Sequence, residues 1–227
     1  MVSGSYVLYQ IEAVMKRTIQ AFVCLLSLFL ATGCVTSLVD AKAKVAEYYE
    51  NGSYERDVAR KLHEAEQLLP RRGAYNIIGS AVVFDIDDTA LSTYEYQKAM
   101  GFGHYGLAWH QWLEMKRGKA IKPVLDFYNQ AKARGLTVFF VSGRREKFRT
   151  VTEENLRAVG FDGWKALYMK PDDFKSKSVV ELKMAHRIAI EKQGYKIILN
   201  IGDQPSDLEG GHAKHTVLLP NLIYGVR

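Results

Sequence analysis

An apolar run that ends in carboxylates constrains the fold of this chain more than any other feature. Residues 81–84 read Ala-Val-Val-Phe, and Asp85, Asp87 and Asp88 follow at once. An uninterrupted apolar run of this length predicts a buried strand, whereas carboxylates resist burial unless they are paired, hydrogen-bonded or bound to metal. The run therefore predicts a strand whose tip carries a cation site with a nucleophilic carboxylate. An acidic turn that closes the strand is the simpler alternative.

Apolar strand patterns and helical patterns alternate through the rest of the chain. Strands are expected at 80–86, 136–141, 166–169, 196–201 and 216–219, and helices at 122–133, 146–159 and 178–192. Gly135, Gly160 and Gly194 follow the three helices at the position where glycine commonly ends a helix. This alternation predicts an α/β fold, a Rossmann-like parallel sheet with helices on both faces.

The alternation breaks between about residues 91 and 121, directly after the acidic strand tip. This stretch is rich in aromatic and histidine side chains, namely Tyr94, Tyr96, Phe102, His104, Tyr105, Trp109, His110 and Trp112. We expect a small helical cap inserted after the first core strand and placed over the site. Its rings could stack on the nucleobase or aryl group of a substrate, or they could form the core of the cap, and the general burial of aromatic side chains leaves both interpretations open.

The N-terminal region carries a targeting pattern. Met15-Lys16-Arg17 precedes an apolar stretch at 19–30 that is too short for a comfortable membrane span, and Ala31-Thr32-Gly33-Cys34 follows it. This pattern resembles the bacterial lipobox, which implies translation from Met15, cleavage before Cys34 and lipidation of Cys34. An ordinary secretory signal or an uncleaved anchor is the alternative. The expectation is an exported protein that is lipid-anchored to a bacterial membrane.

Three segments follow from these patterns. Residues 1–33 are expected to be upstream residues and signal peptide, 34–73 a tether with N-terminal helices, and 74–227 the main α/β domain with the cap at about 91–121. Helical spacing at 41–69 is interrupted at 51–53, so two helices are expected there. Because Cys24 and Cys34 are the only cysteines, a chain cleaved before Cys34 has no internal disulfide.

The charge balance bears on the class of partner. The net charge is +6 and the isoelectric point about 9.1, but the basic residues are dispersed along the chain. A dispersed basic balance does not indicate nucleic-acid binding and is compatible with a small anionic substrate. We therefore expect no nucleic-acid partner; the oligomeric state is not readable from the sequence.

Four strand or helix ends carry polar groups that a parallel sheet would bring to one edge. Asp85 and Asp87 follow the first strand, and Ser142, Gly143 and Arg144 follow the second. The remaining groups are the lysines at 175, 177 and 183 and the segment Gly202–Asp207. Each alone could be a turn, a helix cap or a solvated charge, so the prediction depends on the ordered set.

Together these segments resemble the haloacid dehalogenase superfamily, whose first motif is D-x-D-x-T and whose fourth is G-D-x-x-x-D. Residues 85–89 read Asp-Ile-Asp-Asp-Thr and residues 202–207 read Gly-Asp-Gln-Pro-Ser-Asp. The runs at 139–146, 151–156 and 200–204 are similar to the acid phosphatase subfamily, which holds bacterial class C acid phosphatases and plant vegetative storage proteins. Bacterial members are often outer-membrane lipoproteins, so the resemblance favours the outer membrane for this chain.

The resemblance implies a phosphoric monoester hydrolase that works through an aspartyl-phosphate. Asp85 would be the nucleophile, and Asp87 would protonate the leaving oxygen and later deprotonate water. Mg²⁺ would be held by Asp85, the Asp87 backbone carbonyl and Asp203, with Asp207 close by or one step removed. A phosphotransferase using the same intermediate is one alternative, and a non-catalytic ligand-binding lipoprotein is another.

The phosphate group is expected to lie on the second strand tip and a lysine. Ser142 and the Gly143 amide would hold its oxygens, and Lys183, or alternatively Lys177, would neutralise it. Asp88 is expected to point away from the site with little effect.

Overall fold

The computed structural model describes Met15 and residues 37–71, 73–74, 77–175 and 178–224. The chain divides into two compact units, Met1–Ala41 and Lys42–Arg227, and every strand among the described residues lies in the second. Cys34, which the sequence predicts to be lipidated, and Lys177, the alternative predicted phosphate lysine, lie outside the described residues. Within the described residues, no helix has the length and apolar character needed to cross a membrane.

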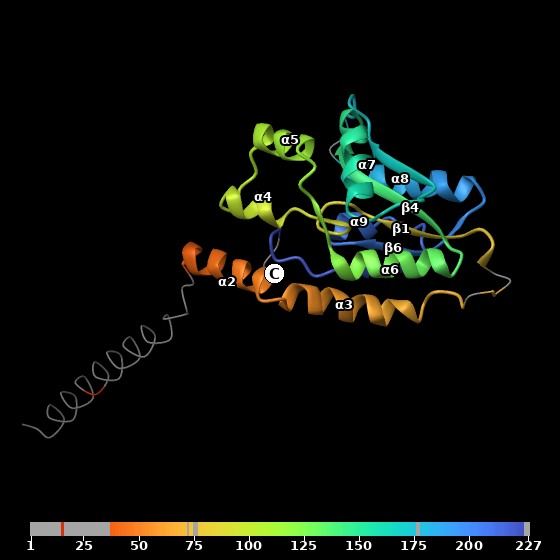
Figure 1. The fold of residues 1–227 in the computed structure, drawn as a ribbon, viewed down its shortest axis with the longest axis horizontal. Helices are drawn as coiled ribbons and strands as arrows, with labels where there is room; N and C mark the ends of the chain where they lie inside the picture. Colours follow the sequence, from red (N-terminus) through yellow and green to blue (C-terminus); the bar gives the residue numbers. More distant parts are fainter. Residues whose placement is uncertain (1–14, 16–36, 72, 75–76, 176–177, 225–227) are drawn as a thin grey trace, which may run out of the picture. The chain divides into compact units, whose positions relative to one another are not determined.

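The second unit is built on a parallel sheet, as the sequence predicts. Its strands are β1 (Ser80–Phe84), β4 (Thr137–Arg145), β5 (Ala166–Lys170), β6 (Lys196–Gly202) and β7 (His215–Leu218). They lie in the order β5-β4-β1-β6-β7, and all their pairings are parallel (Figure 1). The predicted α/β fold is therefore confirmed.

Strand β1 lies at the centre of the sheet, where the strand order reverses. The chain leaves β1 toward β4 and β5 on one side, and β6 and β7 complete the sheet on the other. Phe84 is in register with Phe140 of β4 and Ile201 of β6, and the Asp85 amide donates to the Ile201 carbonyl at 2.9 Å. In open α/β sheets the ends of the strands at such a reversal form the ligand crevice.

Apolar side chains of β1 point alternately to the two faces of the sheet, and all are buried. Val82 and Phe84 belong to a core shared with α3 (Ser53–Glu66) and α6 (Lys122–Ala133). Ala81 and Val83 pack in a second core with Ile190 of α8 (Val179–Lys192). Figure 1 shows α3 and α6 on one side of the strands and α8 on the other. Burial on both faces explains why the strand is an unbroken apolar run.

The predicted helix ends are confirmed, with one change at a helix start. Gly135, Gly160 and Gly194 have φ of +94°, +102° and +90°, the left-handed conformation that favours glycine. The helix expected at 146–159 is instead a 3₁₀ turn, η2 (Glu146–Phe148), followed by α7 (Arg149–Ala158). Strand β4 continues to Arg145, beyond the expected end at 141, and Phe148 leaves helical geometry, with its ring packed 4.9 Å from that of His110.

The segment after β1 forms the predicted helical, aromatic-rich cap. It consists of β2 (Leu91–Ser92), α4 (Tyr94–Ala99), α5 (Gly106–Glu114) and β3 (Lys119–Ala120), with β2 and β3 paired antiparallel. The rings of Tyr96, Trp109 and Trp112 pack on one another, with the two indoles stacked at 5.2 Å. Tyr96 and Trp112 are buried, so much of the aromatic content of the cap is its own core.

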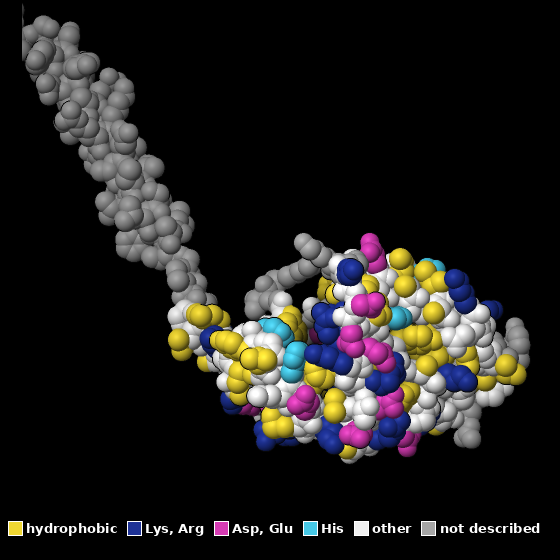
Figure 2. Space-filling model, turned by 90° about the horizontal axis from the view of Figure 1, so that it is seen from above, with side chains coloured by type: hydrophobic (Ala, Val, Ile, Leu, Met, Phe, Trp, Pro, Cys, Tyr) yellow, Lys and Arg dark blue, Asp and Glu magenta, His cyan; other side chains and the backbone are white. Residues whose placement is uncertain are grey.

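Surface charges of opposite sign are mixed. On the face shown in Figure 2, lysine and arginine side chains lie among aspartates and glutamates. Among the described residues, ion pairs such as Lys116–Glu154 and Lys119–Glu95 connect exposed side chains of opposite charge.

Candidate active site

Three buried carboxylates meet at the C-terminal ends of β1 and β6. Asp85 follows β1, Asp203 follows β6, and Asp207 lies in the short helix α9 (Pro205–Leu208). One oxygen from each carboxylate lies within 4.8 Å of one from each of the others. Carboxylate oxygens at this spacing fit the ligand preference of a hard divalent cation.

Lys183 of α8 supplies the positive charge of this cluster. Its ammonium donates to Asp85 Oδ1 and to Asp207 Oδ1, both at 2.5 Å, and its side chain is 6% exposed. Burial lowers the pKa of Lys183, but the two carboxylates outweigh it and raise that pKa above the ordinary value. Three carboxylates against one ammonium leave two surplus negative charges when all are ionised. A bound divalent cation would neutralise them.

The pKa values of Asp85 and Asp203 are affected by burial and by the surplus negative charge of the cluster. Burial raises the pKa of Asp85 well above its ordinary value, Lys183 opposes this, and the neighbouring carboxylates add to it. Burial and Asp207 raise the pKa of Asp203 to about 6. Without a cation, both carboxyl groups therefore favour the neutral form more than a solvated aspartate does.

Asp207 is held by hydrogen bonds to both its carboxylate and its backbone carbonyl. Its carboxylate accepts from the Gln204 amide at 2.9 Å, and its carbonyl accepts from Arg187 and Asn200 at 2.8 and 2.9 Å. Gly202 provides the room, because a Cβ there would come to 2.5 Å from Asp207 Oδ2.

Asp87 lies beside the cluster in a fork formed by Arg144. Arg144 Nε donates to Asp87 Oδ2 at 3.0 Å and Arg144 Nη2 donates to Asp87 Oδ1 at 2.6 Å. Arg144 is itself held by Thr152, and its guanidinium lies 5.9 Å from the ring centroid of Trp109 in the cap. A bidentate guanidinium fixes the plane of a carboxylate as well as pairing its charge.

A cavity of about 270 Å³ opens on these groups. Its walls are formed by Asp85, Asp87, Gly143, Val179, Lys183, Asp203, Gln204, Ser206, Asp207 and Tyr224. Gly143 thus lies at the cavity, whereas the Ser142 hydroxyl is buried and accepts from the Arg144 amide at 3.1 Å. The structure brings together Asp85, Asp87, Gly143, Lys183, Asp203 and Asp207, with Ser142 adjoining them.

The sequence interpretation missed residues of the C-terminal tail. The aromatic ring at this cavity is that of Tyr224, not a ring of the cap, and its hydroxyl accepts from Gln97 of α4 at 2.7 Å. Asn221 contacts Asp203 directly. No periodic pattern marks residues 220–224, which read Pro-Asn-Leu-Ile-Tyr, so the sequence signal is limited to single side chains, Asn221 and Tyr224, after the last strand.

Asp88 is buried and hydrogen-bonded, which the sequence does not indicate. It is buried at φ +55°, and its carboxylate accepts from the Thr93 amide at 2.7 Å and the Thr93 hydroxyl at 2.5 Å. Burial raises the pKa of Asp88 to about 8. Asp88 therefore fixes the start of the cap helix α4 and does not line the cavity.

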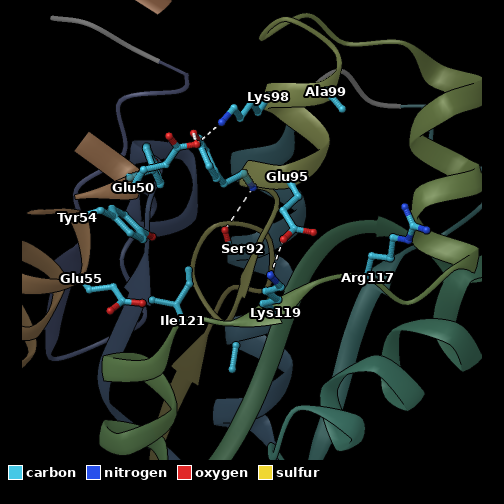
Figure 3. A pocket seen from close by; sticks show the side chains of 13 residues that line it. Glu50, Tyr54, Glu55, Ser92, Glu95, Lys98, Ala99, Arg117, Lys119 and Ile121 are labelled. Atoms are coloured by element: carbon cyan, nitrogen blue, oxygen red, sulfur yellow. Dashed lines mark hydrogen bonds and ion pairs between the residues drawn. The ribbon is translucent and has the colours of Figure 1, made fainter. Parts of the chain in front are cut away.

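A larger cavity, of about 760 Å³, lies between the N-terminal helices and the cap (Figure 3). Its charged groups are largely matched with one another: Glu50 pairs with Lys98, and Glu95 pairs with Lys119 at 2.5 Å. It has none of the clustered carboxylates, so its size alone does not make it the reactive site.

The fold and the carboxylate cluster define an α/β protein with a candidate divalent-cation site, and comparison with known proteins gives its family. The family model described as "HAD superfamily, subfamily IIIB (Acid phosphatase)" matches residues 31–227, and the chain belongs to this family.

Curated relatives agree with this assignment, and a solved structure shares the fold. Acid phosphatase 1 of Solanum lycopersicum is 30% identical over 79% of this chain and 72% of its own length. Vegetative storage protein 1 of Arabidopsis thaliana is 37% identical over 63% of this chain and 54% of its own length. The class C acid phosphatase structure from Bacillus anthracis has a TM-score of 0.65 at 19% identity, covering 83% of this chain and 86% of that one, which shows the shared fold.

The match to two soybean stem proteins is partial in length. The 28 kDa glycoprotein of Glycine max is 36% identical over 64% of this chain. The chain spans 59% of that protein and 50% of a 31 kDa stem glycoprotein.

Proposed function

We propose that this protein is a Mg²⁺-dependent acid phosphatase that hydrolyses small phosphomonoesters through an aspartyl-phosphate. The observation that carries the proposal is the position of Asp85. It stands at the reversal point of the sheet, paired with Lys183 at 2.5 Å, within a cluster of three carboxylates that open on a cavity. Membership of the acid phosphatase subfamily supports the reaction class.

In this mechanism Asp85 attacks phosphorus. The Asp85 oxygen–phosphorus bond forms as the ester phosphorus–oxygen bond breaks, and Asp87 gives its proton to the departing alcohol. Asp87 then takes a proton from water, which attacks phosphorus and breaks the bond to Asp85. Inorganic phosphate leaves, and both carboxyl groups return to their starting states. If an alcohol attacks phosphorus in place of water, the phosphoryl group passes to that alcohol, and the protein is a phosphotransferase.

The surrounding residues would neutralise and orient the phosphate. Lys183 supplies a charge, the Gly143 amide supplies a hydrogen-bond donor, and Ser142 shapes the strand end that presents it. The carboxylates of Asp85, Asp203 and Asp207 would hold Mg²⁺. The resemblance to the family implies the Asp87 backbone carbonyl as a further ligand. When bound, Mg²⁺ would let two anions, the nucleophile and the phosphate, approach each other.

The test is hydrolysis of an aryl phosphate by the purified full chain from mildly acidic to neutral pH, with Mg²⁺ and with EDTA. We expect turnover that EDTA abolishes and Mg²⁺ restores, and loss of turnover with a retained fold in Asp85→Asn. Wild-type-like activity of folded Asp85→Asn would exclude the mechanism. If folded, Mg²⁺-loaded protein turns over none of a panel of phosphomonoesters, the ligand-binding lipoprotein becomes the better account.

Export and lipid anchoring through Cys34, with the outer membrane favoured, are a separate part of this proposal. They rest on the sequence at 15–34, which lies outside the described residues except for Met15. The relatives named above are plant proteins and lend the anchor no support. Incorporation of labelled palmitate into a bacterially expressed chain, and its loss in Cys34→Ser, is the expected result; equal labelling of both would refute the assignment.

A further inference from the structure

Asn221 in the C-terminal tail connects the candidate metal ligand Asp203 to the helix α2 (Leu38–Glu50). Its amide nitrogen donates to Asp203 Oδ2 at 2.7 Å. Its amide oxygen accepts from the Ile223 backbone at 2.7 Å and from the Tyr49 hydroxyl at 3.3 Å. Tyr49 and Asn221 are 172 positions apart in the sequence, and Asn221 and Asp203 are 18 positions apart, so these contacts join three distant parts of the chain.

These contacts fix which way the amide faces. A side-chain amide has one accepting and one donating end, and exchanging them would turn its N–H groups toward two other donors. With two donors on the oxygen, Tyr49 and Ile223, the nitrogen must face Asp203. Tyr49 therefore acts on the carboxylate by setting the orientation of Asn221.

The carboxylate of Asp203 is held at both oxygens. Oδ2 accepts from Asn221 and from Gln204 at 2.8 Å, and Oδ1 accepts from the Thr89 hydroxyl at 3.1 Å. Each oxygen of an ionised carboxylate has two lone-pair directions, so Oδ1 keeps one free for a cation. Groups that orient a ligand in this way commonly change metal affinity when they are removed.

Tyr49 is itself held in place by neighbouring rings. Its ring stacks on Tyr54 at 4.3 Å and on Tyr94 at 4.8 Å, so the direction of its hydroxyl is set by a column of three tyrosines. Tyr54, labelled in Figure 3, also donates to the Asp88 carbonyl at 3.3 Å. The column rests on the backbone of the loop that carries Asp85 and Asp87.

We propose that Asn221, oriented by Tyr49, is a positioning residue that presents Asp203 to a divalent cation. This inference rests on the metal site of the proposed function. It extends that site to a tail residue and to a tyrosine on an N-terminal helix, neither of which touches the substrate cavity directly.

The test is calorimetric titration of Mg²⁺ into the metal-free full chain, which reads binding without turnover. Asn221→Leu keeps the size of the side chain and removes both amide ends, and we expect it to weaken Mg²⁺ binding by about tenfold or more. Tyr49→Phe removes one hydroxyl, and we expect a loss of about threefold. Because both changes act on one contact, the double variant should bind no more weakly than Asn221→Leu alone.

Tyr48→Phe is the matched control. It removes the hydroxyl of the neighbouring tyrosine on α2, which donates to Asp57 at 2.9 Å, and it should leave Mg²⁺ affinity unchanged. Wild-type affinity in folded Asn221→Leu, or additive losses in the double variant, would overturn the inference. If Asn221→Leu does not fold, equal affinities of Tyr49→Phe and Tyr48→Phe would overturn it. Wild-type protein that binds no Mg²⁺ would overturn the proposed metal site, and this inference with it.

Discussion

The ammonium of Lys183 lies 2.5 Å from a carboxylate oxygen of Asp85, and both side chains are buried. The expected nucleophile is thus ion-paired before any phosphate arrives. Lys183 also contacts Asp207 at 2.5 Å, so one lysine joins the end of β1 to helix α9.

Lys183→Ala should remove most turnover and destabilise the metal-free fold. The change leaves Asp85 and Asp207 buried without a counter-charge, and breaking a buried pair in this way costs about 3–5 kcal/mol. Urea unfolding and aryl phosphate hydrolysis measure the two effects. Lys177→Ala is the comparison; if it is the damaging change and Lys183→Ala is benign, the assignment of the phosphate lysine is wrong.

Asp87→Asn should slow hydrolysis most for poor leaving groups. A proton from Asp87 matters more when the departing oxygen is a strongly basic alkoxide than when it is a nitrophenolate. We expect the ratio of kcat for an alkyl phosphate to kcat for a nitrophenyl phosphate to fall at least about tenfold. Arg144→Lys removes the bidentate hydrogen bonds to Asp87, and we expect it to lower the same ratio by a smaller factor. A ratio unchanged in both variants would contradict the role of Asp87 as acid.

Gly202→Ala should displace Asp207 and weaken Mg²⁺ binding. The added Cβ would lie 2.5 Å from Asp207 Oδ2, and overpacking of this kind costs about 1–3 kcal/mol. Gly106→Ala is the control, because a Cβ there meets no atom within 4 Å. Thermal unfolding without Mg²⁺ measures the loss of stability, and the added stabilisation by Mg²⁺ measures the loss of binding. Equal unfolding temperatures of the two alanine variants in both conditions would show that Asp207 moves aside without a cost in stability or binding.

His186 should make the protein less stable as the pH falls. Burial lowers the pKa of His186 below its ordinary 6.5, Lys183 lowers it further, and a Met169 backbone contact and Glu146 oppose them. Below pH 6.5 the unfolded chain takes up a proton that the folded chain resists, so this contribution to stability is present above that pH and is lost below it.

His186→Phe tests this effect, because phenylalanine can keep the ring contact with Tyr168 (5.2 Å) without titrating. Urea midpoints at neutral and mildly acidic pH should differ less in His186→Phe than in wild type. His104→Gln, on the exposed cap, should keep the wild-type difference. An identical pH dependence in all three proteins would remove His186 from the account.

The sheet could be predicted because β1, β4 and β6 are largely buried between two layers of helices, so each contains a short run of consecutive apolar residues. Parallel pairing then brings Asp85, Gly143 and Asp203 to one edge without further information. The start of α7 was harder to place, since the strand before it continues past the expected end into a 3₁₀ turn.

Long-range side-chain contacts could not be predicted in the same way. Asn221 and Tyr224 act through contacts that no local pattern encodes, and the role of Asp88 depends on a positive φ and on Thr93. The resemblance to a known family located the carboxylates, but the relation of Arg144 to Asp87 became visible only in three dimensions.

The central strand is also the first strand of the sheet to be synthesised, and this has a consequence for how the protein matures. Within the described part of the chain, β1 pairs with β4 (residues 137–145) and β6 (residues 196–202), so both of its edges stay unpaired until those residues have emerged. Strand pairing over such sequence separations is slow, and until it is complete the unpaired backbone edges of β1 remain exposed and prone to aggregation. The newly made chain is therefore expected to need protection from self-association until its last third arrives.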